Sequence, residues 1–235
     1  FACMGRLQEA RSQFNETLRI AEESRELEVL GWAIALSADL PRLCGGGESG
    51  LERARRSLGI AEQSDNPSNQ VIAYVALGEA HLAEGQPAAA REAVRESLAL
   101  ARGHGVTKQT LPWSLAVLAE AALALGERTE AIASAREGID LGRAGGCGYY
   151  EAGAQLALTA ALLATDGVVP RAEIESALAR AEQLVESIAA RSLSPRILER
   201  RGRLAAALGD GGAAQRLLRE ALDLDRAIGA FGHAN

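Results

Sequence analysis

Glycine-rich loops and titratable side chains are where this chain could do chemistry, and Gly45–Gly50 is its one glycine-rich loop. A loop that cradles phosphates also needs a Lys followed by Ser or Thr, and the only lysine is the distant Lys108. The Gly-x-Ser-x-Gly pattern of serine hydrolases is missing as well, because Leu51 stands where its last glycine should be. We therefore interpret Cys44–Gly50 as an inserted loop between helices.

The histidines do not have the spacing of a metal site. His81, His104 and His233 lack a second His or a Cys at ligand spacing. His81 fits the aromatic position of a repeated helix, which predicts a packing role. The acidic residues are spread among arginines at helix-surface spacing, which predicts solvated faces with weak pairs three or four residues apart.

The cysteines do not form a disulfide or metal framework. Cys3, Cys44 and Cys147 are far apart, and none belongs to a Cys-x-x-Cys pair. We expect reduced thiols in a cytoplasmic protein. Cys147 begins an expected helix, where a thiol pKa can fall, but no base is paired with it. The sequence therefore predicts no catalytic residue, no cofactor and no metal.

The elements that hold these residues must be helices. The chain has 235 residues, of which 48 are Ala and only 3% are aromatic. Ala and Leu favour helices, whereas the β-branched and aromatic types that favour strands are scarce. A net charge of −6 does not suit binding to a nucleic-acid backbone. We find no signal peptide and no apolar run near the roughly 18 residues of a membrane span.

Small residues recur at a constant interval along the chain. In each of three stretches, a small residue lies twelve positions before another: Gly78 and Ala90, Ala119 and Ala131, Gly202 and Ala214. A glycine at 85, 126 or 209 stands between the two members of each pair, where it can end one helix before the next begins. Helices joined by such short turns lie antiparallel, so the small residues should mark their closest approach.

Weaker copies of this pattern occupy the rest of the chain. Gly5–Ala21 resembles the second helix of a pair without its first, and Glu26–Leu40 should form a helix that ends near Pro41. Tyr149–Ala164 and Arg171–Ala190 should form another pair, joined by the loop Asp166–Pro170. The total is about eleven helices, roughly five and a half pairs.

We interpret residues 1–235 as a single domain. Its repeats are partial and irregular over 1–64 and regular over 68–144, and a C-terminal group covers 147–235. Because the chain opens with Phe1 and the first expected pair is incomplete, we expect a piece of a longer protein that supplies the missing helix.

This pattern resembles the tetratricopeptide repeat (TPR), in which a W-x2-L-G-x2-Y helix is followed by an A-x3-F-x2-A helix. Here the spacing averages roughly 40 residues, against 34 in the family. The resemblance implies an all-α, right-handed superhelical solenoid of antiparallel helix pairs, with a concave face lined by the first helix of each pair.

The C-terminal part carries a narrower resemblance. Ala190–Pro195, Glu199–Ala205, Leu218–Leu222 and the ending Gly229–Ala234 are similar to the tail of large bacterial proteins with a class III adenylate/guanylate cyclase domain and a signal-transduction ATPase. Heavy use of Ala and Arg with a single lysine is also typical of proteins from GC-rich bacterial genomes. Related repeats occur in helix-turn-helix transcriptional regulators of the same ATPase class, which is the alternative parent.

The resemblance also implies which residues line the concave face. The candidates for binding are Glu79, Leu82, Trp113, Ala116, Glu120, Arg196, Glu199 and Arg203. Trp113 can be a binding anchor or a core residue. The Arg196, Arg200, Arg201 and Arg203 cluster can receive an acidic partner or form a solvated face. Arg201 takes a position that is Leu in the other pairs.

These observations predict a non-catalytic scaffold for protein interaction or sensing within a bacterial multidomain signalling protein. Its partner would be a protein or peptide, including another domain of the parent chain, rather than a nucleic acid or a membrane. Pairing of exposed solenoid ends into a homodimer stays open. An all-α enzyme is disfavoured because neither a cluster of acidic residues nor a metal set is evident.

Overall fold

The computed structural model describes residues 2–44, 48–164 and 167–230. Parts of the expected loops Cys44–Gly50 and Asp166–Pro170, and the expected C-terminal motif after Ala230, lie outside these ranges. Within them the chain is helical and has no strand.

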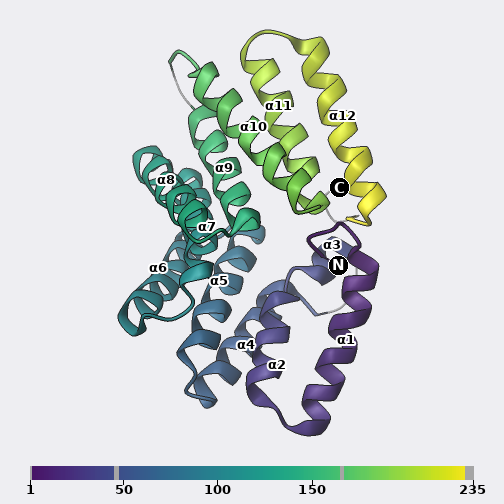
Figure 1. Cartoon of the computed structure of the whole chain (residues 1–235), viewed down its shortest axis with the longest axis vertical. Coiled ribbons are helices and arrows are strands. Elements are labelled where there is room, and N and C mark those ends of the chain that lie inside the picture. Colours follow the sequence, from purple (N-terminus) through teal and green to yellow (C-terminus); the bar gives the residue numbers. More distant parts are fainter. Residues whose placement is uncertain (1, 45–47, 165–166, 231–235) are drawn as a thin grey trace.

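The described residues form twelve α-helices, eleven of them with ten or more residues (Figure 1). The α-helices are α1 Leu7–Ser24, α2 Leu27–Leu36, α3 Leu40–Cys44, α4 Gly50–Gln63, α5 Pro67–Ala83, α6 Pro87–His104, α7 Leu111–Ala124, α8 Arg128–Ala144, α9 Gly148–Leu163, α10 Arg171–Ser187, α11 Ser194–Ala207 and α12 Gly211–Ile228. Two short 3₁₀ helices, η1 Lys108–Thr110 and η2 Arg191–Leu193, precede α7 and α11. The prediction of an all-α chain of about eleven helices is confirmed, with the short α3 as an addition.

Local signals mark the ends of several helices, and at three turns they are the glycines that the sequence predicted. The three turn glycines, Gly85, Gly126 and Gly209, have φ angles of 68°, 81° and 84°, in the left-handed region that glycine adopts without strain. The Asn66 side chain caps α5 by accepting hydrogen bonds from the backbone N–H groups of Ser68 and Asn69.

The small residues do mark the closest approach of paired helices. A Cβ atom at Gly78 would overlap Cγ2 of Val94, and one at Gly202 would lie 2.9 Å from Cγ of Leu218. Val94 and Leu218 each stand four positions after the alanine that pairs with the glycine, so the two hairpins have the same internal geometry. The constant interval therefore reflects a real steric requirement.

The pairs stack into two layers, which we call the inner helices (α2, α5, α7, α9, α11) and the outer helices (α4, α6, α8, α10, α12). Successive inner helices contact one another, from α2–α5 to α9–α11. In Figure 1, α6 and α8 lie at the outer edge of the stack. The inner layer is thus the tighter one, as a concave face requires.

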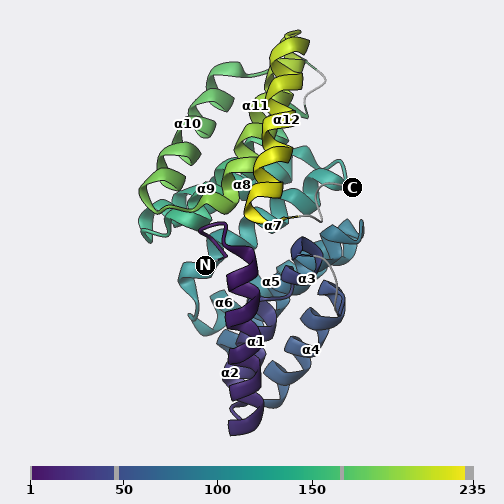
Figure 2. The same cartoon turned by 90° about the vertical axis from the view of Figure 1, so that its right-hand side faces the viewer.

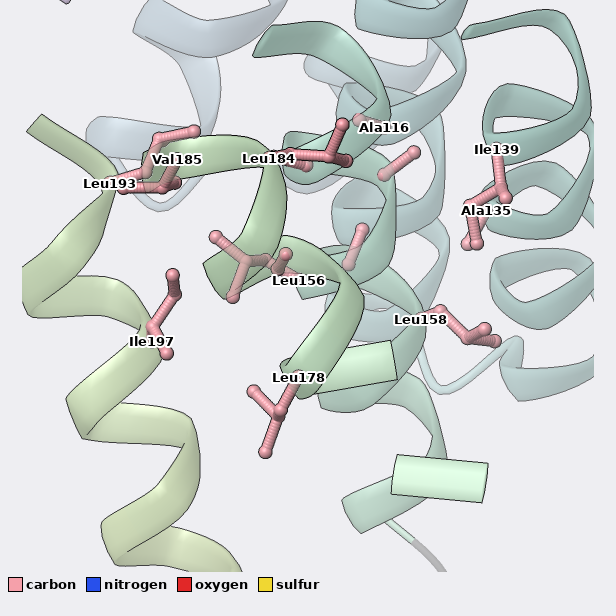
Figure 3. Packing of buried hydrophobic residues seen from close by; sticks show 14 of the residues in the cluster. Ala116, Ala135, Ile139, Leu156, Leu158, Leu178, Leu184, Val185, Leu193 and Ile197 are labelled. Atoms are coloured by element: carbon pink, nitrogen blue, oxygen red, sulfur yellow. The ribbon is translucent and has the colours of Figure 1, made fainter. Parts of the chain in front are cut away.

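The largest core cluster joins the layers from α7 to α11 (Figure 3). Leu156 of α9 and Leu178 of α10 are fully buried there, beside Ile197 of α11. Neighbouring hairpins also contact each other, as α6 does with α7 and α8 with α9, so clusters of buried side chains follow one another along the stack.

The prediction of one helix from Glu26 to Leu40 is wrong. Helix α2 ends at Leu36, and a separate short helix, α3, then contains Pro41 in its first turn, where proline is tolerated. The reason is tertiary packing: Leu40 and Cys44 of α3 turn toward α1 and are buried against it.

The two ends of the solenoid meet. The start of α1 lies beside the end of α12 in both views (Figures 1 and 2). The backbone N–H of Ser192 donates to the carbonyl of Cys3 at 3.0 Å, and Ala230 packs with Leu7 and Ala10. The sequence did not predict this contact, which joins the first and the last helix of the stack.

None of the described helices is both long and apolar enough to cross a lipid bilayer.

Candidate functional site

The concave interior gathers aromatic and charged side chains from four inner helices. Trp113, Tyr150 and Arg196 are each the third residue of their helix, in α7, α9 and α11 respectively. The stacking of hairpins brings these equivalent positions to one level of the interior. The residues around this level are therefore the candidate binding surface.

An aromatic cluster stands at its centre. The rings of Trp113 and Tyr150 are stacked, with centroids 5.7 Å apart and planes 7° apart. Tyr149 meets Tyr150 edge-on, also at 5.7 Å. Burial raises the pKa of both tyrosines to about 12, so both phenols stay neutral at physiological pH.

Trp113 lies between the core and the inner surface. Its ring is half-buried and packs beside the cores of two neighbouring repeats. Its Nε1–H group donates to Oε1 of Glu79 at 2.8 Å, which ties α7 to α5 on the inner face. The indole is thus held in place by contacts within the chain.

A charged pair spans the interior. Arg196 of α11 donates to Glu120 of α7, across the intervening α9, and both side chains are about one-third exposed. The carboxylate of Glu120 raises the pKa of Arg196. A contact between helices two pairs apart is possible only because the inner face curves sharply.

Glu79 lies in a strongly acidic environment. Burial is the main cause that raises its pKa to about 7, and the nearby charges of Asp39 and Glu120 act in the same direction. The hydrogen bond from Trp113 and the charge of Arg196 act in the opposite direction. At neutral pH this carboxyl group therefore exchanges between its protonated and ionised forms.

The structure brings four of the eight predicted site residues together, namely Glu79, Trp113, Glu120 and Arg196. Glu199 and Arg203 lie further along α11 and pair with each other at 2.6 Å. Leu82 packs against a core cluster, and Ala116 is 8% exposed within another. The arginine cluster is also divided, because Arg201 pairs with Glu182 of α10 at 2.6 Å.

Tyr149 and Tyr150 are functional candidates that sequence reasoning missed. The signal that could have found them is their position, because Tyr150 lies one repeat after Trp113 at the same place in its helix. Sequence reasoning had used Tyr149 only as the start of the expected helix Tyr149–Ala164.

A cavity of about 240 Å³ opens beside Trp113, between α2, α4, α5 and α7. Its apolar lining residues include Ala35, Leu36 and Leu51. Its acidic lining residues are Asp39, Glu48, Glu79 and Glu84.

Away from this surface, His81 is buried and has a hydrogen-bond partner within the fold. His81 is 9% exposed, and its Nδ1 lies 2.8 Å from Oε1 of Gln86. Among the residues that the structure describes, no group of three or more His, Cys, Asp or Glu side chains could hold a metal ion.

Comparison with known proteins agrees with this architecture. A family model of the tetratricopeptide repeat matches residues 71–104, which cover α6 and most of α5. Among solved structures, the chain is similar to the crystal structure of BtubC (BKLC) from P. vanneervenii, with a TM-score of 0.63 and 16% sequence identity. That likeness covers 97% of this chain and 92% of the other. Comparison with curated protein sequences gives no match.

The fold and the match together define the class: a TPR-like solenoid of antiparallel helix pairs. A tetratricopeptide repeat supports a general role as a scaffold for protein interaction. Repeats of this kind are typically non-catalytic.

Proposed function

We propose that this chain is a non-catalytic scaffold that binds a peptide segment or a protein domain on the inner helices. The observation that carries the proposal is the convergence of Trp113, Tyr150 and Arg196 at one level of the concave interior. Trp, Tyr and Arg are the residue types most enriched at binding hot spots, and here packing holds them in place.

The arrangement of these side chains suits binding of a ligand better than catalysis. The aromatic cluster provides rigid contact area at a small cost in conformational entropy. The pair of Arg196 and Glu120 provides charges of both signs beside it, which can select a ligand by its polar groups. None of these side chains forms a nucleophile–base or metal arrangement with another.

The proposed setting is a cytoplasmic bacterial signalling protein that resembles a cyclase with a signal-transduction ATPase. In that setting the solenoid acts by differential binding: a partner, or another domain of the same chain, docks on the inner helices and favours one state of the ATPase or cyclase. A helix-turn-helix regulator is the alternative. The domains encoded beside this segment separate the two, because a cyclase domain supports the first and a helix-turn-helix domain the second.

A peptide selection with matched charge swaps tests the binding surface. Peptides of twelve residues are selected from a random library against the full chain, and their affinities are measured for two double variants. One swaps the inner pair (Glu120→Arg with Arg196→Glu), and the other swaps an outer pair (Arg102→Glu with Glu137→Arg). Each variant keeps an ion pair and the net charge.

We expect the inner swap to weaken the selected peptides at least tenfold and the outer swap to leave them unchanged. Circular dichroism and thermal unfolding of both variants verify that the fold persists. If no peptide is selected, or if both swaps have the same effect, the inner helices are not the binding surface.

A further inference from the structure

Helices α1 and α2 lie side by side at one end of the stack and expose an apolar surface (Figure 1). Ile20 of α1 and Leu27, Val29 and Trp32 of α2 are each between 42% and 51% exposed. Large apolar side chains that gather on neighbouring helices mark a surface for another element. The next repeat shows which element covers such a surface.

The pairs α2–α4 and α5–α6 are related by an interval of 40 residues. The Ser57 hydroxyl of α4 donates to the carbonyl of Gly31 in α2 at 2.8 Å. The Ser97 hydroxyl of α6 donates to the carbonyl of Val71 in α5 at 3.1 Å. Donor and acceptor both move by 40 positions from one pair to the next, so this interval identifies equivalent residues.

The same interval relates α1 to α4. Ala21 and Ala61 are both buried at the same place near the ends of these helices. Ile60 of α4 packs against its inner partner, because a Cβ atom on Gly31 of α2 would lie 3.2 Å from its Cγ2. The equivalent residue of α1 is the exposed Ile20. Helix α1 is thus an outer helix without an inner partner in the described residues.

The interval also relates α2 to α5. Asn69 of α5 donates to the carbonyl of Glu28 in α2 at 2.8 Å, and Ile72 belongs to a core cluster that includes part of α2. Both side chains are 8% exposed. Their equivalents in α2 are Val29 and Trp32, which are exposed because no described inner helix lies before α2 in the stack.

The turn before α1 repeats the end of an inner helix. Gly5 has a φ angle of 75°, and its N–H donates to the carbonyl of Ala2 at 3.0 Å. Gly85, Gly126 and Gly209 each donate to the carbonyl three positions earlier, also at 3.0 Å. Each of the four glycines stands two positions before its outer helix. The chain therefore enters α1 as it enters α6, α8 and α12.

We infer that the surface formed by Ile20, Val29 and Trp32 binds an α-helix of the inner type, whose C-terminal end continues into the turn Ala2–Gly5. This helix pairs with α1 as α2 pairs with α4, and it packs on α2 as α2 packs on α5. It buries the apolar end of the solenoid, which a stack of repeats requires. Its binding does not depend on the proposed function, because no ligand of the candidate binding surface takes part.

Helix α5 shows the chemistry of such an occupant. Trp113 stands six positions before the small residue of α7, as Ile72 does in α5, so Trp113 is the equivalent of Trp32. Ala76 and Ala80 of α5 lie in the core cluster against which Trp113 packs. The occupant therefore needs Ala or Gly on the face that meets Trp32, since small residues let a helix approach an indole closely.

The test supplies an inner helix of known sequence. A copy of residues 66–84, which hold α5 and its two caps, replaces residues 1–4 of the chain. The copied helix then enters Gly5 as α5 enters Gly85. We choose α5 because it already covers the equivalent tryptophan in the next repeat.

The fluorescence of Trp32 reports whether the copied helix docks. Trp113→Phe is introduced into every protein compared, so that Trp32 is the remaining tryptophan. The matched control is the same extended chain with Ala76→Glu and Ala80→Glu in the copy alone. Circular dichroism follows the helix content of the extended chain and the control.

We expect acrylamide quenching of Trp32 to fall at least threefold in the extended chain and to stay unchanged in the control. Ile20→Ala should lower the midpoint of thermal unfolding more in the extended chain than in the natural one. Equal quenching in the extended chain and the control would overturn the inference, as would an extended chain that fails to fold while the control folds. Analytical ultracentrifugation of the natural chain covers the other occupant: a dimer that Trp32→Glu dissociates would assign the surface to a second copy.

Discussion

The outer and inner faces of the solenoid use the same residue types, Arg and Glu, in different ways. On the outer face, exposed pairs join one outer helix to the next, as Arg102 does with Glu137 at 2.7 Å and Arg136 with Glu173 at 2.7 Å. On the inner face, Arg196 reaches Glu120 two pairs away, and both side chains are less exposed. The outer pairs recur from repeat to repeat, whereas the inner pair occurs once in the described residues.

This difference separates architecture from recognition. A contact that recurs with the repeat serves the stacking of any two neighbouring pairs, so it carries no information about a ligand. The inner positions break the repeat: the third residue is Trp113 in α7, Tyr150 in α9 and Arg196 in α11. Side chains that vary at a fixed structural position are what a scaffold needs in order to be specific.

The largest effect on stability should come from a substitution that forces an inner helix away from its outer partner. Gly78→Leu places a side chain where even a Cβ atom would overlap Val94, so we expect a loss of about 1–3 kcal/mol in the free energy of unfolding. Urea denaturation measures it. Gly153→Ala is the control, because its Cβ meets nothing within 4 Å, and it should stabilise by roughly 0.5–1 kcal/mol. Equal stability of Gly78→Leu and the natural chain would refute the close approach.

A second prediction concerns burial on the inner face. The pKa of Glu79 is about 7 in the folded chain, against 4.5 for an ordinary Glu. The unfolded chain thus gains more from ionisation as pH rises from about 4.5 to about 7, and stability falls over that range. Glu79→Gln removes this penalty and keeps an acceptor for Trp113. We expect the variant to be about 1–2 kcal/mol more stable at pH 8 and unchanged at pH 4.

Urea denaturation at the two pH values checks this prediction. The control is Glu137→Gln on the outer face, which should show no gain at pH 8. A destabilised Glu79→Gln variant at pH 8 would mean that the carboxylate is already ionised and useful in the folded chain.

A third prediction compares one arginine from each face. Arg196→Gln leaves Glu120 on the inner face without its partner. We expect the free energy of unfolding to fall by about 1 kcal/mol, which lies between the values for exposed and buried ion pairs. Arg102→Gln should cost less than about 0.5 kcal/mol, because both members of its pair are about half exposed. Thermal unfolding of the two variants measures both losses. Equal losses of stability would contradict the distinction between the two faces.

The sequence predicted the parts of the fold that are local and repeated. Turn glycines and the interval from Gly78 to Ala90 are set by contacts within one hairpin, so they leave a pattern in the residues. Two other features, helix α3 and the contact of Cys3 with Ser192, depend on packing between distant parts of the chain. A local sequence pattern therefore cannot predict them.

The candidate site also has a part that the sequence could predict and a part that it could not. Glu79, Trp113, Glu120 and Arg196 could be placed on the inner face from the resemblance alone, but their pairing depends on how sharply the stack curves. Sequence reasoning expected weak pairs three or four residues apart, and the structure has such pairs, as Arg171 with Glu175 at 2.8 Å. It did not expect pairs between repeats, as Arg91 of α6 forms with Glu127 at the start of α8 at 2.7 Å. That partner lies one repeat away, beyond the reach of a search at helical spacing.

The smallest effect should come from a single outer pair. A double-mutant cycle on Arg102 and Glu137 should give a coupling of about 0.2–0.5 kcal/mol at low salt and less at 0.5 M NaCl, because exposed charges are screened. The same cycle on Arg196 and Glu120 should give a larger coupling that changes less with salt, since that pair is less exposed. If the outer coupling proved the larger and more salt-resistant of the two, the outer pairs would be the ones that fix the curvature, and the inner pair would be free to open for a ligand.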